Sequence, residues 1–214
     1  MKLNQAGQTL LESLIAIAII LIGLVSLIGL LISINRTTID AIDQAKALVL
    51  AQEAVEAIHS MRDSNWLERE AGFDVDDSDG LRSGTNYTGV YVWDPTADPL
   101  SVAIIGGTDI NHPTAIVYQD ANGYYRQNGS SPEPSWTPTI FRRWLTLYPI
   151  CLDTVTSVEL IVSNNGTACS NYTSGSGPPY QEIGFQVVST VQWTKRGTHS
   201  VTDEELLYNW KYAD

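Results

Sequence analysis

The stretch that decides the fold is residues 13–35, SLIAIAIILIGLVSLIGLLISIN, which contains no charged side chain. Its core, residues 14–34, exceeds the roughly 18–20 apolar residues that a helix needs to span a bilayer. A helix satisfies its backbone hydrogen bonds internally, so this segment can lie in lipid. The small-residue cleavage site of a secretory signal does not follow it, since the next residues are NRTT. We therefore expect a membrane-spanning helix that is not removed as a secretory signal.

The residues just before the apolar run bear on function. Gly7 ends the short stretch MKLNQAG, and Glu12 follows five residues later, at the edge of the apolar run. A carboxylate costs roughly 2.5–3.5 kcal/mol near the centre of a membrane helix, and less near the interface. An ionisable residue in such a place is a candidate functional residue with a partner to be found.

In these residues the chain resembles the type IV prepilins and pseudopilins. The resemblance implies that a prepilin peptidase cuts after Gly7 on the cytoplasmic side and methylates the new amino terminus at Gln8. Glu12 matches the glutamate at the fifth mature position, and we expect it to form an assembly salt bridge with the amine that cleavage creates. The first mature residue of the family is commonly Phe, whereas Gln8 is more typical of a minor subunit. In a filament, this helix would then pack against the corresponding helices of other pilins.

A helical period continues beyond the apolar run. Apolar residues recur at spacings of three and four, the pattern of one helix face, at Ala41, Ala45, Leu48, Ala51, Val55, Ile58 and Met61. We expect one helix from about Thr9 to Arg62, on the order of 80 Å long. Asp63, Ser64 and Asn65 form turns and caps, so we expect the helix to end there.

The rest of the chain has the period of β-strands. Short alternating runs occur at 87–93, 102–105, 114–118, 124–126, 140–148, 157–162 and 184–194. In the last run, one face is formed by Phe185, Val187, Ser189, Val191 and Trp193. A turn at 197–199 precedes residues 204–211, which we interpret as a closing strand, with a helix as the competing interpretation. The five tryptophans 93, 136, 144, 193 and 210 are expected to anchor the core rather than form a sugar-stacking platform.

These elements predict an α+β fold, in which a long amino-terminal helix packs on an antiparallel β-sheet domain as in pilins. We divide the chain into a leader (1–7), a transmembrane or filament-core helix (8–35), an amphipathic continuation (36–66) and a β-rich extracytoplasmic domain (67–214). Lys2 and the α-amine favour a cytoplasmic amino end, so the large domain is expected outside the membrane. It would later belong to a cell-surface or periplasmic filament.

The two cysteines, Cys151 and Cys169, are too few for a disulfide-framework protein or a four-cysteine zinc site. Both lie in the part expected outside, so we predict a disulfide; two free thiols are the alternative. The bond would close a loop containing Asn164 to Gly166 and contribute roughly 3 kcal/mol. Pilins commonly carry a disulfide in this region.

The charge balance and the motifs exclude several classes. Acidic residues number 24 against 12 basic ones, a net charge of −12, so we expect no nucleic-acid partner. The three histidines, His59, His112 and His199, lack ligand spacing, and no catalytic serine, zinc-protease or phosphate-loop motif occurs. We expect no enzyme activity and no cofactor.

An acidic run is the best candidate for a metal site, and it is a weak one. It contains Asp74, Asp76, Asp77 and Asp79 before Gly80, which resembles the start of a calcium loop. If Gly80 takes the turn position, Val75 falls where the first ligand belongs and Asn86 where the bidentate Glu belongs. A solvated acidic loop is therefore favoured over a metal site.

The sequence thus predicts a structural minor pilin or pseudopilin. Its expected partners are the prepilin peptidase, other pilins through the amino-terminal helix, and the membrane before assembly. Two alternatives stay open: an uncleaved membrane-anchored binding domain or adhesin, and a membrane-anchored surface enzyme. The sequence leaves the choice between a pilus, a secretion pseudopilus and a competence apparatus open.

Overall fold

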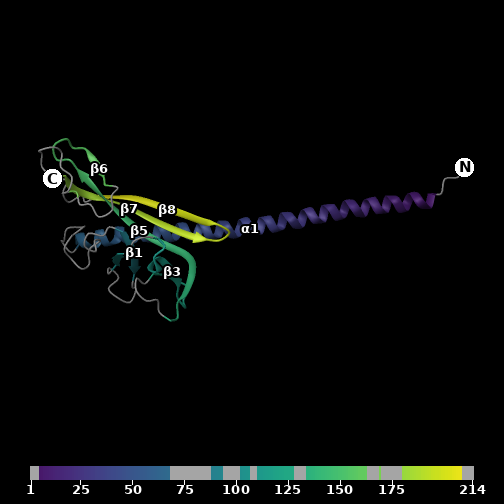
Figure 1. Cartoon of the computed structure of the whole chain (residues 1–214), viewed down its shortest axis with the longest axis horizontal. Coiled ribbons are helices and arrows are strands. Elements are labelled where there is room, and N and C mark those ends of the chain that lie inside the picture. Colours follow the sequence, from purple (N-terminus) through teal and green to yellow (C-terminus); the bar gives the residue numbers. More distant parts are fainter. Residues whose placement is uncertain are drawn as a thin grey trace. The chain divides into compact units, whose positions relative to one another are not determined.

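The computed structural model describes residues 5–67, 88–93, 102–106, 110–127, 134–162, 169 and 180–208. It divides into two compact units, Met1–Ala45 and Lys46–Asp214. The described residues form one long helix, α1 (Gln5–Leu67), a short 3-10 helix, η1 (Pro113–Ala115), and an antiparallel sheet (Figure 1). The predicted α+β class is confirmed.

Helix α1 is continuous, as predicted, but the predicted end at 63–65 is wrong because the helix continues to Leu67. Asp63 lies inside the helix rather than in a turn, and its carboxylate contacts two side chains of the same helix. Its carboxylate lies 3.2 Å from His59 Nδ1, one turn earlier, and 2.9 Å from the guanidinium of Arg62. The contact with His59 has the i,i+4 spacing that supports a helix, so this turn-forming residue is compatible with a helical position.

The face of α1 that meets the sheet differs in part from the predicted stripe. Ala51, Val55, Ile58 and Met61 are buried as expected, whereas Ala41, Ala45 and Leu48 are exposed. Ala47, Leu50 and Ala54 are buried as well. Leu48 and Leu50 lie about 200° apart around a helix, and both are apolar. The hydrophobic period alone therefore could not choose between them.

The sheet has eight strands within the described residues, all antiparallel. They are β1 (Thr88–Trp93), β2 (Val102–Gly106), β3 (Ile116–Gln119), β4 (Tyr125–Arg126), β5 (Thr137–Leu152), β6 (Glu159–Ile161), β7 (Gln181–Thr194) and β8 (Thr198–Tyr208). Strand β5 is central: β7 pairs with one of its edges, and β3, β1 and β6 pair in turn with successive parts of β5. Strand β8 continues the sheet beyond β7.

The core lies between this sheet and α1. Ala54, Val55, Ile58 and Met61 pack against Leu145, Leu147, Phe185, Val187 and Leu207. Ala47, Leu50 and Ala51 pack against Val117, Phe141, Val191 and Trp193. The prediction that five residues of β7 share one face is confirmed, and all five are buried.

Several strand bounds differ from the prediction, most clearly in β5, which was expected to end at Tyr148, before Pro149. The carbonyl of Pro149 accepts a hydrogen bond from Val162 N, on the side of β6. In an antiparallel strand, the N–H and C=O of one residue point to the same neighbour. The missing N–H of Pro149 therefore costs no bond to β7, and the strand continues to Leu152.

The closing hairpin also begins earlier than predicted. The turn lies at 195–197 rather than 197–199, and β8 already starts at Thr198. The strand interpretation of 204–211 is correct for the described part, 204–208. The run at 114–118 divides into the 3-10 helix η1 and the start of β3.

Candidate functional site: the amino-terminal helix

The first part of α1 exposes a continuous apolar surface. Every side chain from Leu10 to Ile42 is exposed, and the large apolar ones up to Ile34 range from 48% at Ile32 to 70% at Val25. The helix is long and apolar enough to cross a membrane by length and composition. Apolar surface of this extent marks a region that lipid or other protein covers.

Three hydroxyl groups on this part of α1 bond within the helix. Ser26 Oγ donates to the carbonyl of Ile22 at 2.9 Å, and Thr37 Oγ1 donates to that of Ser33 at 2.7 Å. Thr38 makes the same contact one residue later. These side chains therefore enter an apolar environment with their hydrogen bonds already made.

Two glycines interrupt the apolar surface. A Cβ added at Gly23 or at Gly29 would meet no other atom within 4 Å. The chain's own packing therefore does not require glycine at either position.

The predicted processing residues lie in the first turns of α1. Gly7 and Gln8 have helical backbone, and Glu12 is exposed. A separation of four residues corresponds to about 6 Å along a helix. After cleavage, the amine of Gln8 and the carboxylate of Glu12 would lie about one turn apart.

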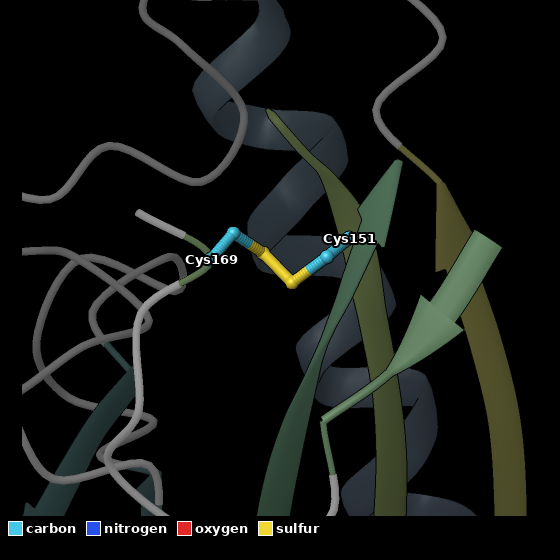
Figure 2. The surroundings of a disulfide bond; sticks show 2 residues. All are labelled: Cys151 and Cys169. Carbon is cyan, nitrogen blue, oxygen red and sulfur yellow. A yellow bond between two sulfur atoms is a disulfide. The ribbon is translucent and has the colours of Figure 1, made fainter. Parts of the chain in front are cut away.

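The two cysteines are joined by a disulfide, which Figure 2 shows between the end of β5 and Cys169. Their Cα atoms are 5.5 Å apart. Cys151 is fully buried and Cys169 nearly so, together with Val162 and the partly buried Tyr180. The loop residues Asn164 to Gly166 lie outside the described residues. The bond attaches Cys169 to the sheet beside the pairing of β5 with β6.

The candidate metal ligands Asp74, Asp76, Asp77 and Asp79 lie outside the described residues. Within the described part of the chain, no group of three or more His, Cys, Asp or Glu side chains is placed to hold a metal ion. The three histidines lie apart: His59 contacts Asp63, His112 caps η1, and His199 stacks on Trp193.

The tryptophan prediction is correct at two positions and wrong at a third. Trp144 and Trp193 are buried in the core. Trp136 is only half buried and lies beside Tyr118, with ring centroids 6.4 Å apart. The side chains of Trp93 and Trp210 fall outside the described residues.

Sequence reasoning missed a buried polar network between the sheet and α1. Arg143 is 1% exposed, and its Nε donates to Gln127 Oε1 at 2.7 Å. Gln127 is buried too, and its amide nitrogen donates to the carbonyls of Ala115 and Arg143. A signal was available, because the alternation Phe141, Arg143, Leu145 places the arginine on the apolar face of β5.

Comparison with known families gives one match. Residues 2–28 match the prokaryotic N-terminal methylation motif, and this range contains Gly7, Gln8 and Glu12. This match supports a type IV prepilin-like protein that is processed by a prepilin peptidase and assembles with other pilins. Neither the comparison with curated proteins nor that with solved structures gave a match.

Proposed function

We propose that this chain is a structural, non-catalytic minor subunit, a minor pilin or pseudopilin, of a type IV pilus-like or type II secretion-like filament. The observation that carries the proposal is the continuity of two features in one helix. The methylation motif at 2–28 covers the first part of an apolar surface that continues to Ile34 and is exposed along its whole length. Such a surface suits a helix that lies first in lipid and then in a bundle of similar helices.

The amino end favours a minor rather than a major subunit. Gln8 stands where major pilins commonly have Phe, as the resemblance implies. The net charge of −12 acts in the same direction, because a filament made of this chain alone would bring many like charges together. A few copies among other subunits would avoid that repulsion.

The role that we assign to Glu12 is to set axial register during assembly. A charge at the edge of the hydrocarbon is poorly solvated and gains from a partner. Cleavage after Gly7 creates a cation, the amine of Gln8, at about the same depth. Subunits in a filament are shifted along the axis, so the amine of an entering subunit can reach the Glu12 of one already docked.

The proposed membrane topology rests on the charges at the amino end of the chain. Lys2 and the α-amine keep the amino end in the cytoplasm, and the β domain lies outside the membrane. The mature chain waits in the membrane and then moves into a filament at the cell surface or in the periplasm. Its partners are the prepilin peptidase and the other pilins.

The experiment is co-sedimentation of the chain with sheared filaments in its own host. Wild-type chain should appear in the filament fraction, at a much lower ratio than the most abundant pilin. Glu12→Ala should be cleaved and inserted in the membrane but depleted from that fraction. Glu56→Ala, which removes an exposed carboxylate of the same helix beyond the apolar part, should co-sediment normally. Normal incorporation of Glu12→Ala, or absence of wild-type chain from filaments, contradicts the proposal.

A further inference from the structure

A group of aromatic residues and one arginine lies on the sheet face that points away from α1. In the β3–β4 hairpin, Val117 and Tyr125 pack toward the core that includes α1. Tyr118 is paired with Arg126, so both point to the opposite face. Tyr118 is also paired with Pro138 of β5, two residues after Trp136. We call Tyr118, Tyr124, Arg126 and Trp136 the outer aromatic cluster.

The guanidinium group connects the rings of this cluster. The central carbon of Arg126 lies 6.0 Å from the ring centroid of Tyr124 and 6.0 Å from that of Trp136. The rings of Trp136 and Tyr118 are 6.4 Å apart and inclined by 45°. At these distances a guanidinium and aromatic rings attract one another. Three rings and one planar cation therefore form one connected surface.

Asp120 holds this surface in place. Its Oδ2 accepts a 2.7 Å hydrogen bond from Arg126 Nε. Its Oδ1 accepts hydrogen bonds of 2.9 Å from the backbone N–H groups of Asn122 and Tyr124. The carboxylate thus fixes both the hairpin turn and the arginine, so the rings need little ordering when a ligand binds.

The chemistry of the cluster suits a neutral sugar. Tyr124 is 62% exposed, so much of its surface is open to a ligand. The charges of Arg126 and Asp120 cancel, and a net charge of −12 for the chain repels polyanions such as nucleic acids. Rigid aromatic faces beside an exposed polar group of the turn, here Asn122, can hold a ligand in a fixed orientation, while the Asp120 carboxylate stays engaged by Arg126 and the turn. The C–H face of a pyranose ring stacks on such aromatic faces while its hydroxyls bond to the polar groups.

We propose that the outer aromatic cluster binds a neutral polysaccharide. This inference goes beyond the filament role and does not depend on it. A contact that only stabilises the hairpin would also bring these side chains together across the strands. It would not require an exposed ring at Tyr124, and it would produce no affinity for sugars.

The test is affinity electrophoresis of the full chain in a polyoxyethylene detergent, which has no sugar head group. Native gels contain hydroxyethyl cellulose, galactomannan, xylan or soluble starch, or single-stranded DNA. Wild-type chain should be retarded by at least one of the four polysaccharides. Tyr124→Ala and Trp136→Ala should weaken that retardation by about tenfold, the effect of losing one aromatic contact. Tyr124→Phe should bind like wild type because it keeps the ring.

Tyr208→Ala is the matched control, since it removes an exposed tyrosine of β8 that contacts Glu159 rather than the cluster. It should be retarded like wild type. Thermal unfolding of each variant checks that the fold is kept. Three results overturn the proposal: no retardation in any polysaccharide, equal retardation of Tyr124→Ala and wild type, or retardation by single-stranded DNA alone. None of them bears on filament assembly, so the two proposals fail separately.

Discussion

The guanidinium of Arg143 in β5 donates a 3.0 Å hydrogen bond to the main-chain carbonyl of Leu50 in α1. The same nitrogen lies 3.3 Å from a carboxylate oxygen of Glu53, one turn further along the helix. Only one rotation of α1 about its axis presents both oxygens to the arginine. Apolar contacts are not directional, so this polar contact selects the helix face that meets the sheet.

Arg143→Met should lower the free energy of unfolding of the β domain by about 2 kcal/mol, because the buried Oε1 of Gln127 loses its hydrogen-bond donor. The measurement is denaturant unfolding of the full chain in detergent, followed by near-ultraviolet circular dichroism. Glu53→Gln is the control and should cost less than about 1 kcal/mol, since Glu53 is partly exposed. Wild-type stability of Arg143→Met would show that the network does not support the fold.

Ser189→Ala should stabilise the domain by about 1 kcal/mol, because an unpaired buried hydroxyl is costly. Ser189 is fully buried between Val187 and Val191, and its Oγ has no hydrogen-bond partner in the described structure. Thr190→Ala, on the opposite face of β7, should change stability little. The same unfolding experiment measures both variants. A loss of stability in Ser189→Ala would mean that the hydroxyl has a partner in solution.

Ser189 also illustrates what the sequence could predict. Strict alternation from Phe185 to Trp193 predicted which residues of β7 share a face, since period two leaves only two faces. The alternation does not explain why a polar serine lies on the buried face. In α1, by contrast, apolar residues surround most of the helix near Leu48 and Leu50. The hydrophobic period of α1 was therefore compatible with more than one buried face. Only the packing against the sheet determines which face is buried.

The sequence likewise predicted one candidate site and missed the other. Gly7, Gln8 and Glu12 form a local motif whose spacing is visible in the sequence. The outer aromatic cluster is not local, because Arg126 belongs to β4 and Trp136 directly precedes β5. Their meeting depends on the pairing of β3 with both β4 and β5. That pairing could not be read from composition or spacing.

Asp120 should give the hairpin a stability that depends on pH. The hydrogen bond from Arg126 holds the pKa of this carboxyl below its ordinary value of 3.8, and the N–H groups of Tyr124 and Asn122 act in the same direction. A lowered folded-state pKa stabilises the fold above the ordinary pKa, and this contribution is lost as the pH falls through the folded value.

The stability difference between wild type and Asp120→Asn should therefore be full at neutral pH and shrink as the pH falls below 3.8. Unfolding curves across that range measure it. Thr190→Ala, which removes no titrating group, gives the baseline. A difference that is independent of pH would indicate that the carboxylate charge does not contribute.

The Cys151–Cys169 bond should be present in the exported protein. Alkylation without reductant should label neither thiol, and Cys151→Ser should lower domain stability by about 2–5 kcal/mol. The paired variant Cys151→Ser/Cys169→Ser controls for a single leftover thiol and should lose a similar amount. Complete labelling of both thiols in the native chain would refute the prediction.

Intact-mass analysis of the chain extracted from host membranes tests the filament-subunit account most directly. The account predicts loss of residues 1–7 and a mature chain that begins at Gln8, with one methyl group added. Gly7→Val should block the cleavage, whereas Gly23→Val, at a glycine with open space around it, should leave it unchanged. A wild-type chain that still begins at Met1, in cells whose prepilin peptidase is active, would contradict the account.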